Sequence, residues 1–253
     1  MKKQSTDQIT LLAVEPDEGD RALLEVKEWI LNECKKQSKT PPQLFGKIIR
    51  QALDEAIDGP RTGRWEISQL EKTEKTYVGT KVEIVTRAAL NLKRGKLDAE
   101  IQGHQVDIKW SKKSAWEIPS EAVDHICLVI GTNDEGTSFS VGLVRCSEDR
   151  LNQGKNKDGK RTLSKVGKCH IVWLVEGSRL EPNFIGALPP EVRGSIMRQE
   201  TAKERVRKFL IYMAGRPFPR SAIETVIHTV TDDIIHVPVD EIEGFIERLN
   251  LGK

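Results

Sequence analysis

The hydrophobic period changes near residue 98, and this change constrains the fold more than any other feature of the sequence. Before it, apolar residues recur at the three- and four-residue spacing of amphipathic helices. After it, residues 99–101 and 106–109 alternate between apolar and polar side chains around Gly103-His104, which predicts a β-hairpin. The combination predicts an α/β fold in which helices pack against a mixed β-sheet.

The same patterns predict the other elements of this region. Helices are expected at residues 20–36, 41–57 and 80–93, with a short one at 120–125. Strands are expected at residues 126–130, 139–144 and 170–175. The first of these strands is almost entirely apolar, as in a central strand buried on both faces. Thr80 and Glu83 have the spacing of a capping box, so the third helix is expected to begin there.

Glycine and proline crowd residues 177–190, which predicts a domain boundary. We therefore expect one domain over residues 1–177 and a second, helical one over residues 184–253. Helices are expected there at residues 191–197, 201–213, 221–229 and 239–249. The middle two flank a short glycine-containing turn, which favours a helix-turn-helix. The stretch from Thr231 is acidic and would repel phosphates, so a structural or dimerising role is the alternative.

Composition excludes several classes of protein. Lys and Arg number 40 against 38 Asp and Glu, so any nucleic-acid binding must come from local rather than net charge. The four cysteines are scattered and lack the spacing of a zinc site, which favours reduced thiols in a cytoplasmic protein. The sequence shows neither a signal peptide nor an apolar run long enough for a membrane helix, so no membrane partner is expected.

The residues best suited to chemistry are Asp98, Asp107 and Lys109. Asp107 and Lys109 are two residues apart on a predicted strand, so both side chains should leave it on the same face. Asp98 precedes the neighbouring strand. Two carboxylates suit Mg²⁺, which prefers oxygen ligands, and a lysine beside them can stabilise charge on a phosphate during hydrolysis.

An acidic-x-Lys triplet alone is a weak signal, because this chain has four of them. Those beginning at Glu25 and Glu33 lie on a predicted helix, where residues two apart face different ways, and the one at Asp158 lies in a glycine- and lysine-rich loop. Only the triplet at Asp107 lies on a predicted strand with another acid nearby. An exposed Asp–Lys pair on a hairpin remains the alternative.

Glu83 is a possible third metal ligand, contributed by the helix before the hairpin. Two structural roles compete with that function. Glu83 could be only the acid of the capping box, or it could pair with Arg87 one helical turn later.

The segment from Arg150 to Lys168 holds seven basic side chains and a single acid. Asparagine and glutamine side chains are interleaved with them. A mobile loop of this composition could follow phosphates and present amides to base edges. A solvated loop between strands is the alternative.

Several motifs, taken in order, resemble the catalytic domain of NaeI-type restriction endonucleases, which belong to the PD-(D/E)xK nuclease superfamily and are related to MutH. They comprise Gly79-Thr80-Lys81-Val82-Glu83, Asp98, Val106-Asp107-Ile108-Lys109, the segment from Trp116 to His125, Asn156 to Ser164, and Leu188-Pro189-Pro190-x-Val192-Arg193. The resemblance covers roughly residues 65–225.

This resemblance implies a Mg²⁺-dependent homodimer that cleaves double-stranded DNA at a palindromic site and leaves 5′-phosphate ends. It implies that Glu83, Asp98, Asp107 and the Ile108 carbonyl bind Mg²⁺, with Lys109 as the catalytic lysine. It also implies a restriction-endonuclease-like core followed by a winged-helix domain, and a partner DNA methyltransferase in a restriction-modification system. The residues expected to contact DNA are Lys112, Lys113, Asn156, Lys157, Asp158, Lys160, Arg161 and Arg220.

Two other functions remain open at this stage. A non-catalytic helix-turn-helix regulator would bind DNA through residues 184–253 without metal. A monomeric DNA-nicking repair endonuclease of the MutH type would use the same carboxylates but cut one strand.

Overall fold

The structure is a computed structural model, and it describes residues 20–228 of the chain. These residues form two compact units. One comprises the residues up to Pro42, Leu90–Gly131 and Ser140–Ser178, and the other comprises Gln43–Ala89, Thr132–Phe139 and the residues from Arg179 onward. The division into functional domains at 1–177 and 184–253 stays a prediction.

The first two helices are confirmed. Helix α1 (Arg21–Lys36) begins after Asp20, whose carboxylate accepts a hydrogen bond from the Leu23 main-chain N–H at 3.0 Å. This is an N-cap, and the apolar side of the helix is buried. Helix α2 (Pro41–Ile57) begins with two prolines, whose missing N–H groups cost nothing in a first turn.

The predicted start of the next helix is wrong. Helix α4 spans Lys72–Ala89, so Thr80 and Glu83 lie inside it and form no capping box. Its N-terminus is instead capped by Glu74, which accepts a hydrogen bond from the Glu71 N–H at 2.7 Å. Gly79 lies in open space within the helix and does not break it.

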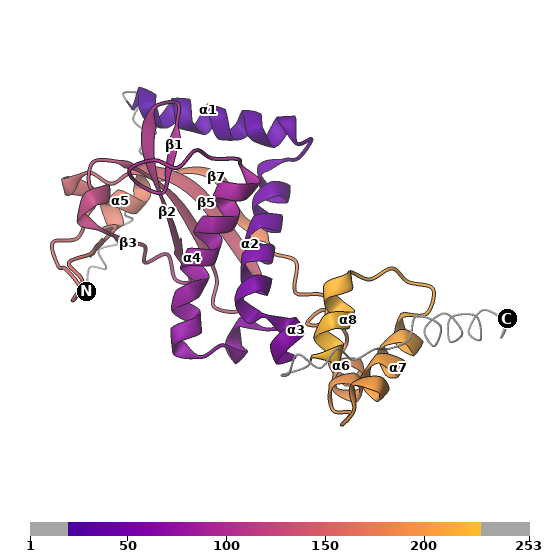
Figure 1. Cartoon of the computed structure of the whole chain (residues 1–253). Coiled ribbons are helices and arrows are strands. Elements are labelled where there is room, and N and C mark those ends of the chain that lie inside the picture. Colours follow the sequence, from indigo (N-terminus) through magenta and orange to yellow (C-terminus); the bar gives the residue numbers. More distant parts are fainter. Residues whose placement is uncertain (1–19, 229–253) are drawn as a thin grey trace, which may run out of the picture. The chain divides into compact units, whose positions relative to one another are not determined.

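A five-stranded sheet lies largely in the first unit, in the order β1-β2-β4-β5-β7 (Figure 1). Its strands are β1 (Ala99–Ile101), β2 (His104–Ser111), β4 (Ile126–Thr132), β5 (Ser138–Arg145) and β7 (Val172–Arg179). β1 and β2 are antiparallel, whereas β2 and β4 are parallel. The predicted mixed α/β fold is therefore confirmed, and every residue of β4 is buried, as its apolar sequence predicts.

The β1–β2 hairpin turns at Gln102 and Gly103, which have φ values of 51° and 80°. Positive φ at both turn residues gives the twist that a two-residue hairpin requires. At the next residue, His104 Nε2 lies 3.0 Å from Oε2 of Glu25 on α1, which ties the hairpin to the first helix (Figure 1).

The first unit also contains elements that periodicity does not predict. Strands β3 (Glu117–Ile118) and β6 (Arg161–Thr162) form a small antiparallel sheet. The short helices are η2 (Ser120–Ala122), η3 (Glu148–Arg150) and α5 (Lys165–Cys169). The helix predicted at 120–125 is thus a single 3₁₀ turn, and the segment 150–168 is structured at both ends, contrary to the expectation of one mobile loop.

A buried cluster joins these elements to one face of the sheet. It contains Trp116, Cys127 and Val129, together with Leu151 and Leu163 from the two ends of the basic segment. Trp116 is 1% exposed, and its indole N–H donates to the Ile130 carbonyl at 2.8 Å, so it is a core residue.

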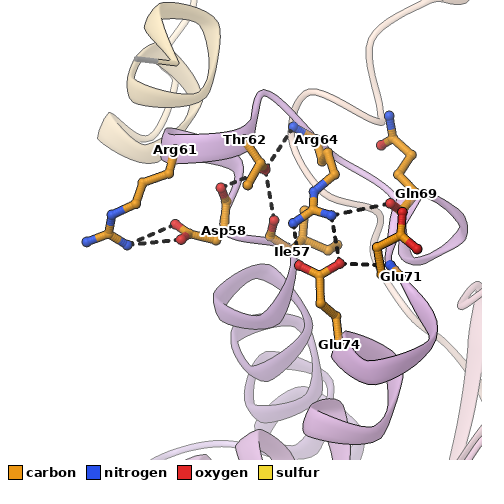
Figure 2. A network of polar contacts seen from close by, with 8 residues as sticks. All are labelled: Ile57, Asp58, Arg61, Thr62, Arg64, Gln69, Glu71 and Glu74. Atoms are coloured by element: carbon orange, nitrogen blue, oxygen red, sulfur yellow. Dashed lines mark hydrogen bonds and ion pairs between the residues drawn. The ribbon is translucent and has the colours of Figure 1, made fainter. Parts of the chain in front are cut away.

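The second unit includes a polar network around the short helix α3 (Gly59–Thr62), shown in Figure 2. Arg64 forms a bidentate ion pair with Glu74, with nitrogen–oxygen distances of 2.7 and 2.8 Å. The hydroxyl of Thr62 donates to the Ile57 and Asp58 carbonyls, and Arg61 pairs with Asp58. The network stabilises the connection from α2 through η1 (Ile67–Gln69) to α4.

Three predicted C-terminal helices are confirmed as α6 (Pro190–Met197), α7 (Ala202–Met213) and α8 (Arg220–Ile227). They share a core around Phe209. Arg205 is 7% exposed and donates to the Val226 and Ile227 carbonyls, closing the end of α8. The described residues do not confirm a winged helix, and the helix predicted at 239–249 lies outside them. No described helix has the length and apolar character that a bilayer span needs.

Candidate active site

The site is organised by strand β2, which carries Asp107 and Lys109. Lys109 Nζ lies 2.7 Å from Asp107 Oδ1. β2 pairs in parallel with β4, so that Asp107 is opposite Cys127 and Lys109 is opposite Val129. Paired residues point to the same face of a sheet, so the Asp–Lys pair lies on the side occupied by the Trp116 cluster. The alternation predicted from sequence is confirmed.

Asp98 reaches the same point from the residue before β1. Its Oδ2 lies 3.7 Å from Lys109 Nζ and accepts a hydrogen bond from the Ile108 main-chain N–H at 2.8 Å. Both carboxylates therefore converge on one ammonium group. This excludes the alternative of an isolated, exposed Asp–Lys pair, since the side chain of Asp107 is only 5% exposed.

Burial is the largest single influence on the pKa of Asp107 and on the pKa of Lys109. Loss of hydration raises the pKa of Asp107 to about 6, although the nearby Lys109 ammonium opposes the shift. Burial also disfavours the charged form of Lys109, but the attraction of Asp107 and Asp98 outweighs it and raises the pKa of Lys109. The site thus brings two acidic side chains together around one ammonium group.

Cys127 is a contact that the sequence did not predict. Its thiol is buried and lies 3.9 Å from Asp107 Oδ2, on the side of the carboxylate away from Lys109. A hydrogen bond with the Cys146 thiol, together with burial, raises the pKa of Cys127, so it faces Asp107 as a neutral thiol. Only the strand register brings these residues together, and pattern alone does not give a register between separated strands.

The donor set suits a hard divalent cation. Among residues 20–228, no three His, Cys, Asp or Glu side chains form a ready-made metal cluster. Mg²⁺ does not require one, because it keeps several waters and is often held by one or two carboxylates. Asp98 and Asp107 offer carboxylate oxygens of the kind that Mg²⁺ prefers, close to one another at the edge of β2.

Glu83 lies on α4, in the other compact unit. Its carboxylate is 3.6 Å from Arg87 Nη2, so the ion pair with Arg87 that the sequence suggested as a structural role is present. The capping role is excluded, because the helix begins at Lys72. Its role as a metal ligand stays a prediction.

The basic segment is ordered around Asn156. Its side-chain oxygen accepts hydrogen bonds from the Asp158 and Lys160 main-chain N–H groups, both at 2.9 Å. Gly159, with φ 76°, completes the turn. Lys157 and Asp158 are exposed at its tip, and Lys160 is half-buried.

Arg161 differs from the other basic residues of this segment. It is 8% exposed, and its guanidinium pairs with Glu148 at 2.5 Å and donates to the Asn152 carbonyl at 2.8 Å. These contacts fix the base of the loop and direct the donors of Arg161 into the protein. Among the other predicted DNA-contacting residues, Lys112 and Lys113 follow β2 directly, and Arg220 is exposed and paired with Glu224 at 2.6 Å.

Comparison with known proteins agrees with this geometry. A sequence profile described as restriction endonuclease NaeI matches residues 35–235, a range that includes Asp98, Asp107 and Lys109. The type II restriction enzyme NaeI of Lentzea aerocolonigenes is 37% identical over 188 residues, which cover 71% of this chain. The matched region spans 59% of the length of that enzyme. The chain belongs to the NaeI restriction endonuclease family.

Proposed function

We propose that this protein is a type II restriction endonuclease that hydrolyses phosphodiester bonds in double-stranded DNA at a specific short palindrome. The observation that carries the proposal is the convergence of Asp98 and Asp107 on Lys109 within a chain of the NaeI family. A buried carboxylate, with a second, partly exposed carboxylate and one ammonium group beside it, is costly to fold and has a clear use in phosphoryl transfer.

Asp98, Asp107 and the Ile108 carbonyl would hold Mg²⁺, with Glu83 as a further ligand. When bound, the ion neutralises phosphate charge and makes a water molecule acidic enough to attack. Lys109 positions that water and offsets the negative charge that develops on the phosphate oxygens. The water oxygen bonds to phosphorus, the bond to the 3′ oxygen breaks, and that oxygen takes up a proton. The products carry 5′-phosphate and 3′-hydroxyl ends.

The basic loop is a further proposed DNA contact, and its base packs on the face of the sheet that carries this chemistry. Leu151 and Leu163, at its two ends, pack in the cluster that covers the Asp107 face of the sheet. Lys157, which is exposed at the tip, and the half-buried Lys160 would bind phosphates, while Asn156 and Asp158 could approach bases. A homodimer would place two such sites on opposite strands of a palindrome, and a cognate methyltransferase would protect host DNA.

The experiment is digestion of unmethylated phage and plasmid DNA with Mg²⁺. We expect discrete fragments whose ends can be religated without added phosphate and map to one sequence. Asp107→Ala and Lys109→Ala should bind the same DNA without cutting it. Single-strand nicks alone, together with a monomer on sizing, would favour a nicking enzyme. Absence of cleavage with Mg²⁺ or Mn²⁺ on all of these DNAs would overturn the proposal.

A further inference from the structure

The loop before Asp98 is built around a side chain of the opposite strand. The Lys93 carbonyl accepts the Glu100 N–H at 2.8 Å, so residues 94–99 fold back on themselves. Glu100 is paired on its other side with Gln105 of β2. Gln105 Oε1 reaches over to the loop and accepts hydrogen bonds from the Lys96 N–H at 2.6 Å and the Leu97 N–H at 3.3 Å.

Gly95 makes room for this arrangement. A Cβ atom at this position would lie 2.3 Å from Gln105 Oε1 and 2.8 Å from the Ala99 carbonyl oxygen. The second neighbour is main chain and cannot rotate away. Gly95 and Gln105 thus form one unit, in which the glycine admits the side-chain amide and the amide closes the turn.

Asp98 follows this turn directly, and Gln105 is two residues before Asp107 on the same face of β2. The main chain leading to Asp98 is therefore fixed by Gln105, and its carboxylate is fixed by the Ile108 N–H. A carboxylate on an exposed loop would otherwise sample many positions. Gln105 converts that loop into a rigid extension of the strand that carries Asp107 and Lys109.

We propose that Gln105 is a positioning residue for Asp98: its side-chain oxygen holds the 95–97 turn so that the Asp98 and Asp107 carboxylates meet at one cation site. The predicted effect of Gln105 on catalysis rests on the proposed function, in which Asp98 and Asp107 act in DNA cleavage. A glutamine suits the role because it accepts both N–H groups and also donates to Glu100 Oε2, at 3.3 Å.

The test compares Gln105→Met, which keeps the length of the side chain but removes the acceptor, with Gln105→Glu made together with Glu100→Gln, which keeps the acceptor and avoids two adjacent carboxylates. Gly95→Ala perturbs the same turn from its other side. Gln51→Met, at an exposed glutamine on α2, is the matched control. Thermal unfolding identifies any variant that fails to fold.

The first readout is amide hydrogen exchange without metal or DNA. Exchange of the Lys96 and Leu97 N–H groups should accelerate by about tenfold or more in Gln105→Met and Gly95→Ala, because these groups lose their hydrogen bonds to Gln105 Oε1. Leu128 and Val129 of β4 should keep their protection, whereas Ile108, whose N–H donates to Asp98, should also exchange faster when Asp98 is displaced. The double variant with Gln105→Glu should keep the protection of the turn. Unchanged exchange at Lys96 and Leu97 in both disruptive variants would overturn the inference.

The second readout is the affinity for Ca²⁺, measured by calorimetry. Loss of a supporting group should weaken binding by about 10–100-fold in Gln105→Met and much less in the double variant with Gln105→Glu. In cleavage assays, Gln105→Met should lower kcat and raise the Mg²⁺ requirement without changing the KM for DNA. Wild-type Ca²⁺ affinity in a folded Gln105→Met protein would overturn the positioning role. Failure of the wild type to cleave DNA would instead overturn the proposed function, while exchange and calorimetry would still decide the role of Gln105.

Discussion

Lys109 Nζ lies 2.7 Å from Asp107 Oδ1, and the two side chains leave strand β2 on the same buried face. This pair fixes the chemistry available to the site. The ammonium compensates a carboxylate that burial would otherwise keep protonated, and Asp98 adds a second carboxylate 3.7 Å from the same nitrogen. The sheet register then places the group beside the cluster that anchors the basic loop.

Replacement of Lys109 with methionine should remove catalysis but not DNA binding. The variant loses the group that offsets charge in the transition state, so single-turnover cleavage should fall by about 10²–10³-fold. Affinity for DNA, measured in Ca²⁺, should change only a few-fold. A Lys109→Met protein that cleaves within tenfold of the wild-type rate would show that another group performs this function.

Lys157 and Arg161 should behave differently although both belong to the basic loop. Lys157→Ala should weaken DNA binding and reduce the salt dependence by about one counterion, with no loss of stability, because its side chain is exposed. Arg161→Met should lower the free energy of unfolding by about 1–3 kcal/mol, because it leaves Glu148 and the Asn152 carbonyl without their partner. Salt titrations and urea unfolding distinguish the two, and equal stability of both variants would contradict a structural role for Arg161.

Trp116 should contribute to stability through its hydrogen bond as well as its volume. Trp116→Phe keeps an aromatic ring but leaves the buried Ile130 carbonyl without the indole donor, at a cost of about 1–3 kcal/mol. Trp116→Ala should cost more, about 3–5 kcal/mol, because it also leaves a cavity. Chemical denaturation measures both, and a Trp116→Phe protein as stable as wild type would show that the hydrogen bond is dispensable.

The Arg64–Glu74 pair should make the second unit sensitive to acid. The hydrogen bonds from Arg64 lower the pKa of Glu74 from 4.5 to about 2. A carboxylate whose folded pKa is depressed stabilises the fold above its unfolded pKa, and the stabilisation is lost as the pH falls from 4.5 to about 2. The difference in urea midpoint between wild type and Glu74→Gln should therefore shrink over this range. A difference that does not change with pH would contradict the assignment.

Sequence periodicity was sufficient to predict the secondary-structure elements on which the site residues lie. Alternation around Gly103-His104 predicted the hairpin, whose turn lies one residue earlier at Gln102-Gly103. Asp107 and Lys109 share a face because residues two apart on a strand always do. The same pattern separated this acidic-x-Lys triplet from those on α1. Helices α1, α2, α6, α7 and α8 were also predicted close to their observed bounds.

Contacts between distant segments were not predictable in the same way. Cys127 meets Asp107 only because of the register of two parallel strands, and Gln105 reaches Lys96 only because the loop folds back at Gly95. Some predictions from local sequence patterns were wrong because tertiary contacts determined the structure instead. Thr80 and Glu83 have the spacing of a cap, yet α4 begins two turns earlier, and Arg161 belongs to a basic run, yet it is buried on Glu148.

Magnesium-dependent cleavage of one DNA by wild type, Asp107→Asn and Glu33→Gln shows whether the Asp107 carboxylate is required for catalysis. Glu33 is the acid of a sequence-equivalent triplet on α1, where it pairs with Lys36, and so it serves as the matched control. We predict that wild type and Glu33→Gln give the same fragments at the same rate, while Asp107→Asn binds the DNA and cleaves about 10²–10³-fold more slowly or not at all. Cleavage by Asp107→Asn at the wild-type rate would show that Asp107 is not part of the active site.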